Sequence, residues 1–331
     1  MSDARDGDYD LSLIVPVHDA APHLEALVKS VFDLGRYNLK CQMICVDDAS
    51  TDDGPAILRD LASNHRGLSV IVNDTGRGAG LARNTGWCHA RGRYSLFFDA
   101  DDILHGGSLV DTIRAMDRDP RTDLAFCAYR YERESTARFT EMGHEDRRIM
   151  DRLLAGRSYA TGSIADMARL LVFANYPWNK VLRSAHYRRA GIKFGRTRVN
   201  NDILGHWHSL LLARRIMLRD SVLCTHIVHP AGTNLTNAFG PDRLELFEAL
   251  EETYDFLQSR PILLRRFGRQ FWELSQLLAA WVRPRLDPGL RDDFTARHIR
   301  LLARLNLSDL ARMRAGQAPA LATSLVHDLI R

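Results

Sequence analysis

The stretch Tyr94-Ser-Leu-Phe-Phe-Asp-Ala-Asp-Asp102 decides the fold, because a short apolar run ends there in a cluster of three carboxylates. Three other short apolar runs precede it along the chain, at Leu11–Val17, Cys41–Asp47 and Leu68–Val72. Runs of this length with polar residues on both sides are typical of buried strands. We therefore expect four strands within the first hundred residues, the last of them over Tyr94–Phe98.

Helices are expected between these strands, because apolar residues recur there at helical spacing. They are predicted over Pro22–Leu34, Gly54–Asn64 and Gly78–Arg91. Strands that alternate with helices in this way favour an α/β fold, in which a Rossmann-like, mostly parallel sheet is flanked by helices.

The rest of the chain is less regular up to about residue 235 and then becomes helical. Strands are expected over Asp123–Tyr131, Val181–Leu182 and Ile216–Val228, and helices over Asp166–Phe173, Ala185–Ala190 and Ile203–Arg214. The charged, glycine-containing stretch Arg133–Ser158 predicts no regular element. After Pro241 the apolar spacing is helical throughout. These patterns predict a first domain over residues 1–235 and a helical C-terminal region over residues 236–331.

Length and composition favour a globular enzyme of the cytoplasm. The 331 residues are 45% hydrophobic and 26% charged, as in ordinary folded proteins. The 45 basic residues are nearly matched by 41 acidic ones, and a net charge of +4 is weak for a nucleic-acid-binding protein. No apolar run approaches the roughly 18 residues that a membrane-spanning helix needs, and the acidic N-terminus does not resemble a secretory signal. We expect a cytoplasmic protein that binds no nucleic acid.

Acidic residues follow three of the predicted strands, at Pro16-Val-His-Asp19, Asp47-Asp-Ala-Ser-Thr-Asp52 and Asp99-Ala-Asp-Asp102. Because ligands of open parallel sheets bind beyond the carboxyl ends of the strands, these segments are expected to converge on one pocket. Together with Arg83, such a pocket would hold a base, a ribose and, through a divalent cation, a diphosphate. The alternative for these aspartates is an ordinary turn or helix-capping role.

Four motifs, taken in their order and spacing, resemble the nucleotide-sugar-binding core of the family 2 glycosyltransferases, which have the GT-A fold. They are Pro16-Val-His-Asp19, Val46-Asp-Asp-Ala-Ser-Thr-Asp52, Gly80-Leu-Ala-Arg-Asn-Thr-Gly86 and Phe98-Asp-Ala-Asp-Asp102. Three further segments resemble the second half of that family's domain. They are Trp178-Asn-Lys-Val-Leu-Arg183, Gly191-Ile-Lys-Phe194 and Asn201-Asp202. The resemblance spans residues 11–235 and implies a GT-A fold with a helical C-terminal extension.

The resemblance implies a metal-dependent, inverting transfer of a hexose from a nucleotide-diphosphate sugar, with a UDP-sugar expected, to an acceptor hydroxyl. The acceptor would belong to a glycan, a cell-wall polymer or a small natural product. The alternatives are a non-catalytic nucleotide-sugar-binding module and a nucleotidyltransferase. A nucleotidyltransferase would share the fold and the metal carboxylates, but no glycine-rich loop with a basic residue follows the first strand to bind a triphosphate.

On the donor side, the resemblance assigns roles to five residues. Pro16, Val17 and Asp19 would line the nucleoside pocket. Asp48 would contact the base, and Arg83 would lie near the base or the diphosphate.

The metal end of the donor site would be formed by the Asp-x-Asp motif. Asp99 would approach the ribose and Asp101 would hold Mn²⁺ or Mg²⁺, with the adjacent Asp102 as a substitute. His229, at the end of the last predicted strand, would contact the metal or the diphosphate, and its alternative is a plain loop histidine.

By the same resemblance, Asp202 would be the catalytic base that deprotonates the acceptor hydroxyl. Its alternative is a helix cap before Ile203. The family commonly carries two acidic residues at this point, so Asn201 is a departure from the pattern. A second departure is His18, where a tyrosine is common.

Trp178, Asn179 and Lys180 are the expected acceptor-side residues, since aromatic rings pack on sugar faces and amides bind hydroxyls. The alternative for Trp178 is a core position. The C-terminal stretch Phe256–Arg331 carries 13 arginines against six acidic residues. Such a surface predicts either a solvated basic face, or a peripheral contact with the inner face of a membrane, or the interface of a homo-oligomer.

Overall fold

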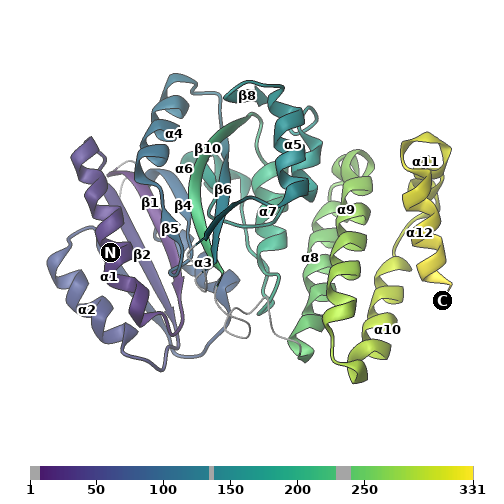
Figure 1. Cartoon of the computed structure of the whole chain (residues 1–331), viewed down its shortest axis with the longest axis horizontal. Coiled ribbons are helices and arrows are strands. Elements are labelled where there is room, and N and C mark those ends of the chain that lie inside the picture. Colours follow the sequence, from purple (N-terminus) through teal and green to yellow (C-terminus); the bar gives the residue numbers. More distant parts are fainter. Residues whose placement is uncertain (1–7, 134–137, 229–239, 331) are drawn as a thin grey trace.

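The computed structural model describes residues 8–133, 138–228 and 240–330, and a ten-stranded sheet forms its centre (Figure 1). The strands are β1 (Tyr9–Val17), β2 (Cys41–Asp48), β3 (Leu68–Asn73), β4 (Gly92–Phe97), β5 (Ile103–Leu104), β6 (Leu124–Arg133), β7 (Arg138–Glu141), β8 (Tyr159–Gly162), β9 (Lys180–Arg183) and β10 (Ile216–Val228). Every residue of β2 is buried, because an inner parallel strand is covered on both faces.

The strand order places the carboxyl ends of the long strands along one edge of the sheet. Hydrogen-bonded neighbours follow the order β3-β2-β1-β4-β9-β6-β10-β5, while β7 pairs with β6 and β8 with β10. The six longest strands, β1 to β4, β6 and β10, point in the same direction, because the short β9 runs antiparallel to both β4 and β6. The expectation of a mostly parallel sheet flanked by helices is confirmed.

Seven helices accompany the sheet in the part of the chain that the structure describes before residue 229. They are α1 (Ala21–Phe32), α2 (Gly54–Asn64), α3 (Ala79–Trp87), α4 (Gly106–Arg118), α5 (His144–Leu154), α6 (Ser184–Ala190) and α7 (Asp202–Leu211). Two 3-10 helices, η1 (Asp33–Tyr37) and η2 (Ala168–Val172), join them. Helix α3 lies so close to β1 and β2 that a Cβ atom at Gly86 would be 2.6 Å from Cγ2 of Ile14. This close packing brings the first turns of α3 to the carboxyl edge of the sheet.

The C-terminal helices stand beside the sheet, on the right of Figure 1. They are α8 (Glu245–Gln258), α9 (Pro261–Val282), α10 (Arg291–Leu302), α11 (Leu307–Arg312) and α12 (Pro319–Leu329), with short helical turns η4 (Pro241–Leu244), η5 (Arg283–Arg285), η6 (Pro288–Leu290) and η7 (Met313–Gln317). Arg169 on η2 binds Glu273 on α9 at 2.7 Å. One apolar core extends from Leu11 in β1 to Leu325 in α12. The division at residue 235 therefore stays a prediction.

Most expected elements lie within a few residues of those observed, and β10 coincides with its prediction. The stretch Arg133–Ser158 was expected to be irregular, but it contains β7 and helix α5. Helix α5 is missed because most of its residues are charged, while Ile149, Met150 and Leu154 still form a buried stripe. The α-helix expected over Asp166–Phe173 is instead a turn followed by η2. In the described ranges, no helix is long and apolar enough to cross a bilayer.

Candidate functional site

The loops after β1 and β2 are joined by two carboxylates. Asp19 has a positive φ of 48°, and its Oδ1 accepts hydrogen bonds from the backbone N–H groups of Thr51, at 2.6 Å, and Asp52, at 3.2 Å. The Thr51 bond lowers the pKa of Asp19. Asp52 in turn accepts from the N–H of Ala21 at 2.8 Å, at the start of α1. These bonds fix the loops in which Pro16, Val17 and Asp19 were expected to line a nucleoside pocket.

Asp48, the expected base contact, is buried and orders the loop that leads to α3. Its Oδ2 accepts from the N–H groups of Arg77, at 2.9 Å, and Gly78, at 2.6 Å, and its Oδ1 accepts from Nδ2 of Asn73 at 3.0 Å. Gly78 has a φ of +87°, which favours glycine. A carboxylate offers about four acceptor positions, and these bonds occupy three of them on a side chain that is only 5% exposed. The base contact itself stays a prediction.

Arg83 forms the centre of the site. Its Nη2 lies 2.5 Å from Oδ1 of Asp99, and its Nη1 donates to Oδ1 of Asn201 at 2.8 Å. The guanidinium is almost entirely buried, so these two bonds hold the end of β4 against the start of α7. Gly80 permits this approach, because a Cβ there would lie 2.1 Å from the carbonyl oxygen of Gly195.

Asn84, the next residue of the same motif, secures the segment on the other side of α3. Its side chain donates to the carbonyl oxygen of Phe194 at 3.0 Å and accepts from the N–H of the same residue at 2.8 Å. The Ala-Arg-Asn motif thus has two structural roles. Arg83 connects the carboxylate of Asp99 to Asn201, and Asn84 fixes the loop before α7.

Asp202, the expected base, is the first residue of α7 and is half-buried. The helix-cap alternative is not what the structure shows, because Asn201 occupies the cap position and no side-chain capping bond forms. Burial raises the pKa of Asp202 to about 6, while the positive charge of Arg83 opposes this rise and the negative charge of Asp99 adds to it. A carboxylate with such a pKa is ionised at neutral pH yet basic enough to take a proton.

The C-terminal helix α8 holds the loop that leads to α7. The N–H of Arg196 donates to Oε2 of Glu252 at 3.2 Å, and its side-chain Nε lies 2.9 Å from Oε1 of Glu248. The N–H of Arg198 donates to Oε2 of Glu245 at 2.5 Å. Three acidic residues on one face of α8 therefore fix the position from which the candidate base emerges.

Trp178, Asn179 and Lys180 are buried, with exposed fractions of 0%, 0% and 2%. For Trp178 the core alternative is the one that the structure shows, since its ring is parallel to that of Tyr176 with centroids 4.5 Å apart. Lys180 Nζ donates to Oδ1 of Asn179 at 2.8 Å and to the carbonyl oxygen of Tyr176. Burial lowers the pKa of Lys180 to about 7. A direct contact of these three residues with the acceptor stays a prediction that would need them to become exposed.

The end of the Asp-x-Asp motif is tied to the last strand. Asp102 is buried, and its Oδ1 lies 2.8 Å from Nδ1 of His226 and accepts from the N–H of Ile227 at 3.0 Å. Burial raises the pKa of Asp102. Burial alone would lower the pKa of His226, but the charge of Asp102 raises it on balance. Asp102 is thus tied to β10 through Oδ1, and its role as a substitute for Asp101 stays a prediction.

Sequence reasoning singled out His229 on this segment, but His229 lies outside the described residues. The residue that it missed is His226, three positions earlier. The signal was present in the sequence, because His226 lies within the expected strand Ile216–Val228, next to the motif-bearing edge. Only the register of β10 with β5, which pairs Thr225 with Ile103, shows that His226 is close to Asp102.

A divalent cation fits the residues at this edge. In residues 8–133, 138–228 and 240–330, no three His, Cys, Asp or Glu side chains surround one point. However, Mg²⁺ and Mn²⁺ take one or two protein carboxylates and fill their other positions with phosphate oxygens and water. Besides burial, the charges of Asp101 and Asp99 raise the pKa of Asp102, whose buried Oδ2 has no hydrogen-bond partner among the described residues. This concentrated negative charge suits a cation held by Asp101.

An open cleft of about 760 Å³ lies elsewhere, at the edge where β6 and β10 begin. It is lined in part by Arg121, Arg214 and Arg215. Arg214 is bound to Asp123 and Arg215 to Asp119, so their charges are already balanced. The chemistry of the chain is concentrated at the opposite edge.

Comparison with known sequences identifies residues 12–174 as a match to the family described as Glycosyl transferase family 2. The chain is 30% identical over 112 residues to the minor teichoic acid biosynthesis protein GgaB of Bacillus subtilis, which is 33% of this chain and 12% of that protein. It is 32% identical over 109 residues to the UDP-Glc:alpha-D-GlcNAc-diphosphoundecaprenol beta-1,3-glucosyltransferase WfgD of Escherichia coli, or 33% of this chain and 42% of that protein. The chain thus spans less than half of the length of these relatives.

Two solved structures share the fold over nearly the whole chain. Residues 1–349 of S. aureus TarS in complex with UDP-GlcNAc superpose with a TM-score of 0.72 and 17% identity, which covers 97% of this chain and 89% of that one. The mannosyltransferase PcManGT from Pyrobaculum calidifontis, in complex with GDP-Man and Mn²⁺, gives a TM-score of 0.55 and 18% identity, which covers 99% of this chain and 88% of that one. The fold with its helical C-terminal region is therefore that of TarS.

Proposed function

We propose that this chain, whose residues 12–174 match glycosyl transferase family 2, transfers a sugar from a nucleotide-diphosphate donor to an acceptor hydroxyl with inversion. A UDP-sugar is the preferred donor. The TarS neighbour binds UDP-GlcNAc and WfgD is named for a UDP-glucose donor, which supports this choice. The observation that carries the proposal is the junction of Arg83 with Asp99 and Asn201 beside the half-buried carboxylate of Asp202.

Asp202 supplies the base. The acceptor oxygen forms a bond to the anomeric carbon of the donor sugar while the bond from that carbon to the diphosphate oxygen breaks, and the proton of the acceptor hydroxyl goes to the carboxylate of Asp202. Burial keeps the pKa of this carboxylate at about 6, near the operating pH of a general base. A single base is sufficient for an inverting displacement, so Asn201 needs to contribute only its hydrogen bond to Arg83.

The leaving diphosphate needs positive charge. Asp101 would hold Mn²⁺ or Mg²⁺, and a bound cation supplies charge stabilisation to the departing phosphate oxygens. Arg83 is buried and paired with Asp99 at 2.5 Å, so its contribution is to orient that carboxylate, and the positive charge at the leaving group would come from the cation. The complex of PcManGT with GDP-Man and Mn²⁺ supports a metal in this fold.

The nucleoside would lie over the joined loops after β1 and β2. Pro16 and Val17 present backbone groups there, Asp19 is partly exposed, and Asp48 would accept from an N–H of the base. Asp99, at the end of β4, is 27% exposed and would approach the ribose. These roles belong to the proposal.

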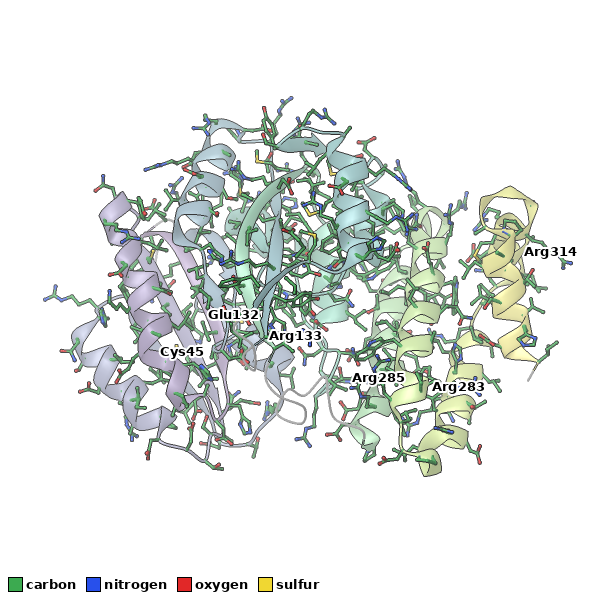
Figure 2. All side chains as sticks on the ribbon, viewed as in Figure 1. Cys45, Glu132, Arg133, Arg283, Arg285 and Arg314 are labelled. Carbon is green, nitrogen blue, oxygen red and sulfur yellow. The ribbon has the colours of Figure 1, made fainter. Side chains whose placement is uncertain are left out.

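We also propose where in the cell the protein acts, from the side chains on its C-terminal helices. Trp281, at the end of α9, is 40% exposed, and the guanidinium carbons of Arg243 and Arg285 lie 4.7 and 4.5 Å from its ring centroid. In Figure 2, Arg283 and Arg285 lie on the C-terminal helical side of the molecule, to the right of Glu132 and Arg133 at the end of β6. The exposed side chains of Trp281, Arg283 and Arg285 support a cytoplasmic enzyme whose C-terminal helices contact an anionic membrane, whereas Arg243 is buried beneath them.

The first experiment is a thermal-shift screen of UDP-, GDP- and dTDP-sugars, each with Mn²⁺. A ligand at 100 times its dissociation constant stabilises the folded state by about 2.7 kcal/mol, so a specific donor is readily seen. UDP-sugars should give the largest shift, and release of UDP should follow when acceptors are added. A shift without any release of nucleotide in the presence of acceptors or water would favour the non-catalytic module, and a shift with nucleoside triphosphates alone would favour a nucleotidyltransferase.

A further inference from the structure

Five aromatic rings form one cluster next to the carboxyl ends of β6 and β10. Tyr176 and Trp178 are parallel with centroids 4.5 Å apart, and Tyr129 meets Trp178 edge-to-face at 5.2 Å and Tyr131 at 5.3 Å. His226 lies 5.3 Å from the ring of Tyr176. Tyr129 and Trp178 are fully buried, whereas the other three rings are partly exposed. Tyr129 and Trp178 therefore form the buried part of the cluster, and Tyr131, Tyr176 and His226 form its partly exposed part.

Hydroxyl groups hold the outer rings in place. Tyr129 donates to Oδ2 of Asp146 at 2.6 Å, its hydroxyl lies 3.3 Å from that of Tyr131, and the hydroxyl of Tyr131 lies 3.2 Å from that of Tyr176. A chain of bonds that starts at a buried carboxylate fixes ring orientation before any ligand arrives. Such pre-organisation reduces the entropy that binding would otherwise cost.

The outer rings also lie between the two parts of the proposed machinery. His226 contacts Asp102, the neighbour of the proposed metal ligand Asp101. On the other side, the carbonyl oxygen of Tyr176 accepts from Lys180, whose charge acts on Asp202. Burial raises the pKa of Tyr176 and the charge of Asp202 adds to this rise, so the phenol is within electrostatic reach of the base.

We propose that the exposed sides of Tyr176, Tyr131 and His226 form a platform on which a sugar ring of the acceptor stacks, so that the acceptor ends in a pyranose and not in an open-chain alditol or an amino-acid side chain. A pyranose offers an apolar face of C–H groups to flat rings, and its hydroxyls remain free at the rim. The proposal rests on Asp202 as the base, and it requires that a sugar stacked on these rings present a hydroxyl to that carboxylate. Tyr176 and Tyr131 take the role that sequence reasoning gave to the buried Trp178.

The test uses the full chain with UDP and Mg²⁺ and compares methyl β-D-glucopyranoside with D-glucitol, which has the same six-carbon sugar skeleton but neither the ring nor the methyl group. Saturation-transfer NMR should show contact of the protein with the pyranoside, strongest for the axial protons H1, H3 and H5 of one face, and little or none with the alditol. Replacement of Tyr176 by Leu should weaken pyranoside binding by roughly three- to tenfold, the range expected for one aromatic contact. Tyr176→Phe keeps the ring and should retain binding.

A matched control is Tyr159→Leu, which removes a 56%-exposed tyrosine on β8 and should leave pyranoside binding unchanged. Binding of UDP, measured by titration calorimetry, should survive in Tyr176→Leu. Loss of pyranoside binding with UDP binding retained would therefore be a failure of the acceptor site and not of the donor site. Three results would each contradict the proposal: equal saturation transfer to D-glucitol and to the pyranoside, no saturation transfer to the pyranoside, or equal pyranoside affinity of the wild type and of Tyr176→Leu. The comparison of the two probes needs no variant, so misfolding of Tyr176→Leu would not prevent the test.

Discussion

The Nη1 group of Arg83 donates a hydrogen bond to Oδ1 of Asn201 at 2.8 Å, across 118 residues of sequence. An acidic residue at position 201 would accept the same bond, so the amide preserves the contact and omits the charge. The departure from the family pattern therefore keeps the contact with Arg83 and spares Asp202 a second negative neighbour. The amide also donates from Nδ2 to the carbonyl oxygen of Arg198 at 3.0 Å, which a carboxylate could not do. This is why Asn201 does not favour a non-catalytic protein.

Asn201→Asp tests this relationship through the pH dependence of turnover. Asp202 works as a base only when ionised, and its raised pKa of about 6 predicts that kcat of the wild type falls as pH drops through about 6. A carboxylate at position 201 should raise the pKa of Asp202 further, because like charges disfavour the ionised form. In the variant, the fall of kcat on the acid side of the pH profile should occur at a higher pH than in the wild type. At pH 8, kcat of the variant should stay within a few-fold of the wild-type value. If kcat falls over the same pH range in both proteins, position 201 does not influence the base.

Asp101→Asn should abolish the effect of metal on donor binding. The amide has the size of the carboxylate but lacks its charge, so it is a poor ligand for a hard cation. Isothermal titration of UDP with and without Mn²⁺ should show strengthening by metal in the wild type and none in the variant. If Mn²⁺ strengthens binding equally in both proteins, the cation is held by other groups.

Helix α8 should control the base through the loop that precedes α7. Glu245→Gln weakens the acceptor for the N–H of Arg198, and we expect a loss of about 0.5–1.5 kcal/mol in stability together with a larger relative loss in kcat than in donor affinity. Thermal unfolding and a kcat-against-KM comparison measure the two effects. Glu251→Gln is the matched control, since it makes the same charge change on α8 and no described contact joins Glu251 to residues 195–198. Equal effects in both variants would remove the positioning role.

The basic end of α9 should bind anionic vesicles in a salt-dependent way. The Debye length falls from about 8 Å at 0.15 M salt to about 3 Å at 1 M, so sedimentation with phosphatidylglycerol vesicles should largely disappear at high salt. Arg283→Glu combined with Arg285→Glu should weaken sedimentation at low salt. Arg121→Glu, an exposed arginine at the far edge of the sheet, should not. A dimeric mass that is indifferent to lipid would instead identify this surface as a subunit interface.

The long strands and the strand-end carboxylates could be predicted because they depend on local pattern. An apolar run such as Leu11–Val17 has few ways to be buried other than as an inner strand, and Asp101 follows one such run directly. The direction of parallel strands then places the carboxylates at one edge. Helix α5 could not be predicted with the same rules, because its charged residues outnumber the few apolar ones that contact the core.

The partners of each side chain could not be predicted, since they depend on register and on contacts distant in sequence. Nothing local to Asp102 indicates that it is buried against His226, and nothing local to Trp178 distinguishes a ring on the surface from one under Tyr176. Likewise, the loop before α7 is fixed by Glu245 and Glu252, which belong to a region without a sequence signature. Long-range pairing decides these positions.

The central claim is that Asp202 is the general base, and Asp202→Asn tests it most directly. The measurement is the ratio of two effects of this substitution, on kcat and on the dissociation constant of the UDP-sugar. General-base assistance contributes about 10²–10⁴-fold, so kcat should fall by that order while the dissociation constant stays within a few-fold, because the residue serves the acceptor and not the nucleotide. If kcat survives within a few-fold, or if kcat and donor affinity collapse together, Asp202 is not the base.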